Sequence, residues 1–219
     1  MTQITPELLL KAYAYGVFPM AKSRHGREVY WVQPKERGII PLDQFHIPRS
    51  LKKVLKRGGY EIRVDSDFPG VIEGCAESGP GREDTWINQE IVALFEDLFG
   101  TGLVHTVETW RDGHLVGGLY GLSMGAVFFG ESMFSRQDNA SKIALCYLVG
   151  IMKSGGYRLL DTQFITDHLK QFGAVEISHK DYLAELGEAL GHLGRFGPPP
   201  SYSELIELVA ASQSSTQTS

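Results

Sequence analysis

The chain has 219 residues, of which 42% are hydrophobic and 21% are charged, so it can bury a core and is not expected to be disordered. Its formal net charge of −5 at pH 7 gives no general attraction to nucleic acid or to an anionic membrane, so a site for a polyanion has to be a local patch. The two cysteines, Cys75 and Cys146, lie in apolar segments and are too few for a disulfide framework, which indicates a reducing cytosol.

The N-terminal residues and the longest uncharged run argue against a targeting or membrane segment. The sequence MTQITPELLLKAYAYG has no basic region followed by a long apolar run, so we expect no signal peptide. Residues 115–130 carry no charge, but this run contains five glycines and is too short to span a bilayer. These features predict a cytoplasmic protein with no membrane segment.

The first predicted element is a helix that begins at Pro6, with Thr5 as its cap, and ends near Tyr15, before Gly16. Residues 18–41 contain several prolines and glycines and are expected to be turn-rich and irregular. Together these two segments indicate a small N-terminal unit.

Helices and strands follow one another from residue 49 onward. We expect further helices, between caps and glycine stops, over 49–59, 67–77, 85–100, 140–156, 166–173 and 180–191. Asp67 is the expected cap of the second of these, and the third is expected to be capped near Asn88. We expect strands over 60–64, 103–110, 114–122, 126–134, 157–164 and 174–178, the second and third joined by the turn signal RDG. The segment 78–84 is expected to be a loop.

This mixed order predicts an α+β fold, or a mixed-sheet α/β fold, with one central sheet and helices on its faces. We prefer the mixed sheet, because helix 140–156 between two strands is typical of a crossover connection. The chain from residue 197 onward is expected to be loosely ordered, and residues 212–219 are expected to be disordered.

The predicted helix 49–59 carries a concentrated positive charge. Five of the 21 lysines and arginines fall within nine of its residues with no acidic residue among them: Arg49, Lys52, Lys53, Lys56 and Arg57. On a helix they lie along one side, which is either an ordinary solvated face or a patch for phosphate contacts. An acidic chain that gathers its cations in this way favours the phosphate patch.

Several aromatic side chains lie near this helix in sequence: Tyr13, Tyr15, Trp31, Trp86 and Phe95. Aromatic faces can stack on exposed bases, and the alternative for each of them is ordinary core packing. Trp86 is the best candidate for stacking, because it follows a polar loop and precedes a helix cap, which is a position at a rim.

Two further polar sites stand out within apolar segments. In a regular strand, Asp161 and Gln163 point to one face while their neighbours point to the other, so they form either a structural pair or a functional site. Glu131 lies among phenylalanines and methionine, where a charge needs a partner. The partner is either an internal cation, Arg136 or Lys142, or a ligand.

The sequence contains no Walker loop, no G-x-G-x-x-G and no histidines or cysteines spaced as metal ligands. We therefore expect no metal and no cofactor. A reaction carried out with this set of residues has to bring its own activated group.

The sequences FFGESMFSRQDNASKIAL, LLDTQFITDHLKQFGA and AYAYGVFPM are the most distinctive of the chain. With HIPRSLKK, VIEGCAE, TWIN and LVGGLYG they follow a collinear pattern over residues 5–185 that resembles the leucyl/phenylalanyl-tRNA–protein transferases. The resemblance departs at Met20, where many members have Trp, and this departure weakens one stacking contact.

The resemblance implies three parts: a small N-terminal domain over residues 1–36, a GCN5-related N-acetyltransferase-like aminoacyl transfer domain over 37–195, and a partly disordered tail over 196–219. The implied activity moves Leu or Phe, less often Met, from aminoacyl-tRNA to the N-terminal Arg or Lys of a protein. The product is then marked for degradation by the N-end rule. The implied partners are aminoacyl-tRNA and proteins that begin with Arg or Lys. The enzyme is expected to be a monomer.

The resemblance also implies roles for individual residues. The expected catalytic residues are Asp161, Gln163 and Glu131. The donor side-chain pocket is expected to consist of Leu119, Met133, Leu148 and Leu160. The expected tRNA contacts, to the 3′ adenosine and the acceptor stem, are Trp86, Phe95, Tyr13, Lys52, Lys53, Lys56 and Arg57, with Tyr13 also placed in the active site.

The expected mechanism is direct attack of an amine on the ester of the charged tRNA. The Gln163 oxygen accepts a hydrogen bond from the amine while Asp161 orients that amide, and the alternative is proton transfer to Asp161 through a water. Two other functions stay open: an acyl-CoA-dependent N-acetyltransferase of the same fold, and a non-catalytic RNA-binding module that uses the basic helix.

Overall fold

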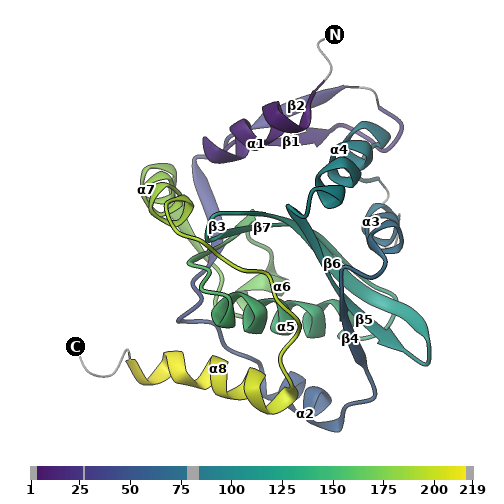
Figure 1. The fold of residues 1–219 in the computed structure, drawn as a ribbon, viewed down its shortest axis with the longest axis vertical. Coiled ribbons are helices and arrows are strands. Elements are labelled where there is room, and N and C mark those ends of the chain that lie inside the picture. Colours follow the sequence, from purple (N-terminus) through teal and green to yellow (C-terminus); the bar gives the residue numbers. More distant parts are fainter. Residues whose placement is uncertain (1–3, 27, 78–83, 216–219) are drawn as a thin grey trace.

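The computed structural model describes residues 4–26, 28–77 and 84–215. A seven-stranded sheet forms its centre, and helices cover both faces (Figure 1). From one edge to the other the strands are β4 (Glu61–Val64), β5 (Val104–Arg111), β6 (His114–Met124), β7 (Val127–Ser135), β8 (Leu159–Gln163), β3 (Glu36–Ile40) and β9 (Val175–Ser178). The predicted α+β architecture with one mixed sheet is confirmed.

Among these strands the pair β7–β8 is parallel, and the other neighbouring pairs are antiparallel. Helix α5 (Ala140–Ser154) joins the parallel pair across one face of the sheet, so the predicted crossover is confirmed. Strand β3 lies between β8 and β9, so a segment from near the N-terminus is built into the sheet beside β8.

The helices divide between the two faces, each with its own hydrophobic cluster (Figure 1). One cluster includes residues of α1 (Pro6–Ala14), α3 (Phe68–Ala76), α4 (Gln89–Gly100) and α7 (His179–Leu190). The other includes residues of α5, α2 (Arg49–Arg57), α6 (Asp167–Lys170) and α8 (Tyr202–Ser215). Within the described ranges, no helix combines the length and apolar character that crossing a membrane requires.

The predicted helix starts are confirmed by their capping hydrogen bonds. The side chains of Thr5, Asp67 and Asn88 each accept a hydrogen bond from the backbone N–H three residues further on. These caps begin α1, α3 and α4 at the residues that the sequence indicates.

Residues 18–41 are not irregular, and that expectation is wrong. They form a two-stranded ribbon, β1 (Phe18–Ala21) with β2 (Val29–Val32), and then strand β3. The pattern of β3 is hard to recognise in the sequence because Arg37, a charged residue, is fully buried in its middle.

The chain after residue 197 is also more regular than expected, because it contains α8. Leu205 and Val209 are one helical turn apart and are both buried in the cluster that includes α5, which holds this helix in place. Residues 216–219 and most of the expected loop 78–84 lie outside the described residues.

Two β-bulges interrupt the centre of the sheet. In the β6–β7 pair, Tyr120 lies opposite Ser132 and Gly121 opposite Gly130, so Glu131 is an extra residue on β7. A bulge of this kind displaces a side chain from the regular alternation of the strand. Glu131 is thereby turned toward the part of the sheet where β7 and β8 separate.

The second bulge lies on β8. Gly38 of β3 lies opposite Gln163, and Ile39 lies opposite Asp161, so Thr162 is the extra residue. The parallel pairing of β7 with β8 ends at Phe129 and Asp161, just before both bulges. The two strands therefore separate at the point where each carries an additional residue.

The close approach of β3 to this bulge requires a glycine. A Cβ atom on Gly38 would lie 2.8 Å from the carbonyl carbon of Phe164, which real Cβ contacts do not tolerate. We expect Gly38→Ala to lower the free energy of unfolding by about 1–3 kcal/mol, measured by urea denaturation, because backbone has to move.

The matched control is Gly100→Ala at the end of α4, where an added Cβ meets nothing within 4 Å. This variant should stay within about 0.5 kcal/mol of the wild type. Equal stability of the Gly38→Ala protein and the wild type would contradict the assignment of a tight bulge at this position.

Candidate active site

A cavity of about 810 Å³ opens where β7 and β8 separate. Its wall includes residues from both sides of the sheet, among them Met20 of β1, Trp86, Leu145 of α5 and Leu169 of α6. Most of the lining is apolar, and a few polar groups converge on it, which is the usual composition of a ligand site.

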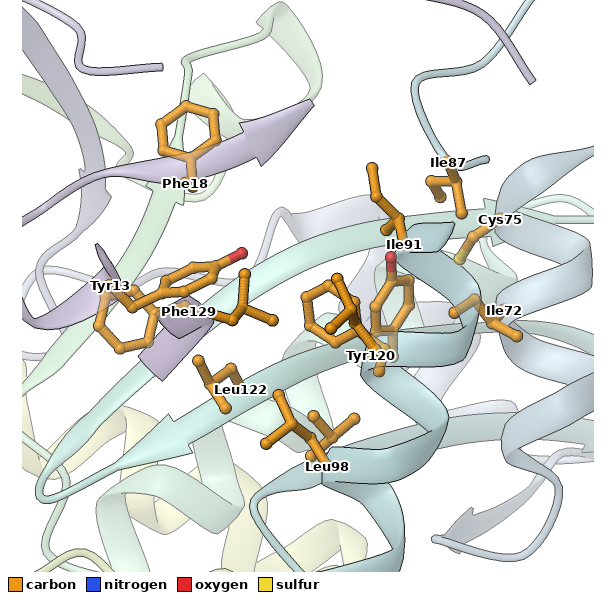
Figure 2. Close-up of a cluster of buried hydrophobic side chains, with 14 of the residues drawn as sticks. Tyr13, Phe18, Ile72, Cys75, Ile87, Ile91, Leu98, Tyr120, Leu122 and Phe129 are labelled. Atoms are coloured by element: carbon orange, nitrogen blue, oxygen red, sulfur yellow. The ribbon is translucent and has the colours of Figure 1, made fainter. Parts of the chain in front are cut away.

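Glu131 enters the cavity wall from the bulge of β7, with 8% of the residue exposed. Its Oε1 accepts a hydrogen bond of 2.8 Å from the hydroxyl of Tyr13 and one of 3.4 Å from the amide nitrogen of Gln163. Tyr13 of α1 is fully buried and does not line the cavity, so its predicted contact with the tRNA is not supported by its position. Its ring packs edge-on against Phe129 at 5.0 Å (Figure 2).

The two internal cations expected near Glu131 bind elsewhere. Arg136 donates to Glu77 and Lys142 donates to Gln171, so of the two alternatives for Glu131 the internal ion pair is wrong. Burial raises the pKa of Glu131 to about 8; the Tyr13 hydrogen bond and the charge of Arg37 oppose this rise, and the charge of Asp161 contributes to it. The site therefore favours binding of a cationic group beside Glu131.

Asp161 lies behind the cavity wall, where it is fully buried, and does not line the cavity. Arg37 donates to both of its oxygens, at 2.9 and 2.7 Å. The hydroxyl of Tyr182 donates at 2.6 Å, and the backbone N–H of Gln163 donates at 2.8 Å. The expectation that the Asp161 carboxylate orients the side-chain amide of Gln163 is wrong, because it holds the backbone instead.

Gln163 does line the cavity, although regular alternation would place it beside Asp161. Its φ is +57°, and the N–H of Phe164 donates across it to the carbonyl of Thr162 at 2.6 Å. A three-residue turn with this sign of φ is the rare and strained form of the γ-turn. The turn and the bulge together separate the two side chains that the sequence pattern pairs.

The apolar residues predicted for a side-chain pocket all lie in the cavity wall. Leu119 and Met133 come from β6 and β7, Leu148 from α5, and Leu160 from β8. Trp86, which is half-buried, also lines the cavity, as its predicted rim position requires.

Phe95 does not reach the cavity, so its predicted contact with a nucleotide is not supported by its position. It is fully buried on the inner side of α4, where its ring packs edge-on against Tyr120 at 5.3 Å. Phe95 belongs to the apolar stripe of an amphipathic helix, and it is therefore a core residue.

The basic side chains of α2 lie away from the cavity wall. Lys52, Lys53, Lys56 and Arg57 are exposed, and α2 packs against α5, which supplies part of that wall. The predicted basic patch thus lies on the exposed side of α2, and the neighbouring helix α5 lines the cavity.

Three side chains of the wall each carry a buried polar atom that has no hydrogen-bond partner among the residues the structure describes. These atoms are the hydroxyl oxygen of Tyr120, Oγ1 of Thr162 and Nε2 of His168. Burial and the charge of Lys142 lower the pKa of His168, so its ring is neutral at neutral pH and can donate or accept. Unpartnered buried polar atoms are rare, and here they surround a space that a ligand can fill.

Sequence reasoning missed Arg37 and Tyr182, which hold Asp161. The available signal was a charged residue directly before the apolar run Gly-Ile-Ile, which indicates a buried strand with an unusual occupant. It also missed a G-x-S-x-G spacing at residues 121–125, but Ser123 lies in strand β6 and its hydroxyl pairs with Tyr157 at 2.6 Å. That serine is not at a strand-to-helix turn and is no candidate nucleophile.

The part of the chain that the structure describes contains no group of three or more His, Cys, Asp or Glu side chains able to hold a metal ion. The cavity has an apolar chamber, a carboxylate that forms no ion pair with any described cation, and a glutamine held by hydrogen bonds. Such an arrangement can position two reactants and bind an ammonium group.

Comparison with known proteins gives a consistent family. The model of the family described as "Leucyl/phenylalanyl-tRNA protein transferase" matches residues 39–187, and the model of its "N-terminal domain" matches residues 2–35. A protein of Rhodospirillum rubrum named leucyl/phenylalanyl-tRNA–protein transferase is 57% identical over 196 residues, covering 90% of this chain and 92% of its own. A protein of the same name from Maricaulis maris is 52% identical over 213 residues, covering 97% of each.

Among solved structures, L-PGS from Bacillus licheniformis is similar with a TM-score of 0.39 and 13% sequence identity, covering 98% of this chain and 72% of that one.

The burial of Glu131 gives a pH dependence that can be measured. Because its pKa is raised in the folded state, the stability it contributes is complete below about pH 4.5 and is lost as the pH rises through about 8. We expect the free energy of unfolding of the wild type, relative to Glu131→Gln, to fall between roughly pH 5 and 8 in urea titrations.

The control is Glu96→Gln, which removes an exposed carboxylate from α4. Its difference from the wild type should stay nearly constant over the same range. A wild-type advantage over Glu131→Gln that stays flat, or grows with pH, would contradict the buried, unpaired carboxylate.

Proposed function

The chain belongs to the leucyl/phenylalanyl-tRNA protein transferase family, and on that premise we propose that it moves Leu or Phe, less often Met, from aminoacyl-tRNA to the N-terminal Arg or Lys of a protein. The product carries an N-end rule degradation signal. The observation that carries this proposal is a single cavity that brings an apolar chamber, Trp86, Glu131 and Gln163 together.

The chemistry needs positioning more than activation. The aminoacyl ester is already reactive, so the amine nitrogen can form a bond to the ester carbonyl carbon while the carbon–oxygen bond to the tRNA breaks. The released 3′ oxygen takes a proton, and the amine loses one. An α-amino group has a pKa of about 7.7–8.0, so a useful fraction is neutral at cellular pH and alignment supplies most of the rate.

The donor side chain occupies the apolar chamber. Four residues of its wall carry apolar side chains without a ring, which favour an apolar donor: Leu119, Met133, Leu148 and Leu160. Discrimination among apolar donors comes from shape, at about 1–3 kcal/mol for each methylene. Trp86, at the same cavity, offers a face for the terminal adenine of the tRNA.

The acceptor amine lies between Glu131 and Gln163. Because the Gln163 nitrogen donates to Glu131, its oxygen is free to accept a hydrogen bond from the incoming amine. Among the described residues no cation forms an ion pair with Glu131, and a substrate ammonium beside it compensates the cost of burying its charge. The unpartnered atoms of Thr162 and His168 are further groups that can bind the substrates.

Asp161 takes no direct part in proton transfer. Its two oxygens already accept four hydrogen bonds, which is the full capacity of a carboxylate. Asp161 therefore has no free acceptor site for a water that could carry the proton of the amine. In our proposal the amine contacts Gln163 directly.

The exposed cations of α2 bind the phosphates of the acceptor stem: Lys52, Lys53, Lys56 and Arg57. Each phosphate contact makes the affinity fall with rising salt concentration. The location of α2 on α5 suits an RNA whose 3′ end enters the cavity from that side of the sheet.

The proposal extends to the organisation of the chain. We assign residues 1–36 to a small N-terminal domain and 37–195 to a GCN5-related N-acetyltransferase-like domain, supported by the parallel pair β7–β8 across α5 in an otherwise antiparallel sheet. One chain supplies every residue of the cavity, so a monomer suffices. The enzyme works in the cytoplasm, where charged tRNA is found.

The test is a transfer assay with Leu-tRNA or Phe-tRNA and a peptide that begins with Arg. We expect the labelled amino acid on that peptide and not on the same peptide with an acetylated N-terminus. Glu131→Gln should lower kcat/KM by about tenfold or more, because the amine loses a charged partner, and should shift the melting temperature far less. Glu96→Gln is the control.

Three results would contradict the proposal. RNA binding without transfer would favour a non-catalytic RNA-binding module. Acetylation of the peptide from acetyl-CoA would favour an acetyltransferase. A Glu131→Gln protein that is fully active but unstable would return Glu131 to a structural role.

A further inference from the structure

We propose that Arg37, together with Tyr182, is a positioning residue of the transfer reaction. By fixing Asp161, this pair holds the backbone turn that presents Gln163 to the cavity. The inference rests on the proposed function, but it concerns residues outside the cavity wall that no comparison assigns.

The turn at Gln163 needs an external support. Four described residues other than glycine have a positive φ: Asp65, Asp112, Asn139 and Gln163. Asp and Asn adopt this conformation readily, since their short side chains bond locally, whereas Gln has no such tendency. A conformation of this kind is strained and persists only where the surroundings enforce it.

The support visible in the structure is the carboxylate of Asp161. Its Oδ1 accepts the N–H of Gln163 at 2.8 Å, which is the bond that orients this peptide group in the turn. The bidentate contact with Arg37 fixes the plane of this carboxylate.

Arg37 is itself held from all sides. Its guanidinium lies 4.6 Å from the ring centres of both Phe18 and Tyr182, and its third nitrogen donates to the carbonyl of Gly16 at 2.9 Å. The planar fork matches the carboxylate and the two rings at once, which a lysine ammonium cannot do. A buried ion pair adds little net stability compared with apolar packing, so its main effect here is geometric.

The same N-terminal segment reaches both polar groups of the cavity. Tyr13 of α1 binds Glu131 directly, while Gly16 and Phe18 hold Arg37 and thereby Asp161 and the turn. Glu131 and Gln163 come from different strands, and this shared segment sets their relative position. A small displacement of Arg37 therefore moves Gln163 and leaves Glu131, which Tyr13 holds, in place.

The experiment compares Arg37→Lys and Tyr182→Phe with the wild type in the transfer assay. Tyr182→Phe keeps the ring over Arg37 and removes only the hydroxyl bonded to Asp161. We expect kcat to fall about 100-fold for Arg37→Lys and about fivefold for Tyr182→Phe, because misplacing a reacting group costs rate rather than affinity. The KM for the peptide should stay within threefold, as should the Kd for a non-reactive aminoacyl-adenosine amide.

Two control variants repeat the same chemistry away from the site. Arg63→Lys changes an arginine that also forks onto a carboxylate, that of Glu61, and lies over Trp110 at 4.3 Å. Tyr157→Phe removes a hydroxyl bonded to Ser123. Both should keep kcat within twofold of the wild type.

A folded Arg37→Lys or Tyr182→Phe protein with wild-type kcat would overturn the inference, as would a loss explained entirely by weaker donor binding. If Arg37→Lys does not fold, Tyr182→Phe decides alone. An inactive wild type would instead refute the proposed function, so the two failures are distinguishable.

Discussion

The arrangement of this molecule depends on one buried carboxylate that accepts four hydrogen bonds. Asp161 is fully desolvated, and Arg37, Tyr182 and the backbone of Gln163 together satisfy it completely. A charge in this setting tolerates only one geometry, because removing any donor leaves an uncompensated oxygen in a low dielectric. Because Arg37 fixes Asp161 and Asp161 binds the backbone N–H of Gln163, the ion pair holds the strained turn in place. This turn brings Gln163 to the cavity.

The cavity exists for a related reason. Two parallel strands that pair as far as Phe129 and Asp161 separate beyond that point, and each carries one extra residue there. The bulge on β7 turns Glu131 inward, while the bulge on β8 precedes the Gln163 turn. The apolar chamber between them is formed by residues that would otherwise be ordinary core. The two bulges and the cavity therefore lie together in an otherwise regular sheet, and the proposed function places the donor and the acceptor there.

Much of this could be predicted from the sequence where local signals decide the structure. The caps at Thr5, Asp67 and Asn88, the hairpin and the crossover helix follow from short-range chemistry. The prediction that four apolar residues line one pocket comes from the resemblance of their motifs to a known family. The positions of Asp161 and Gln163 could not be predicted, since period-2 alternation assumes a strand without a bulge. Arg37 could not be assigned either, because its partner is 124 residues away.

The most direct measurement is hydrogen exchange of the Gln163 amide, followed by NMR. If the buried Asp161 carboxylate holds this N–H, its exchange should be about as slow as that of Leu119 in the centre of the sheet. Exchange as fast as that of Asp112, in the exposed turn between β5 and β6, would show that the turn is free. That result would contradict the account, because Gln163 would then have no fixed position from which to receive the amine.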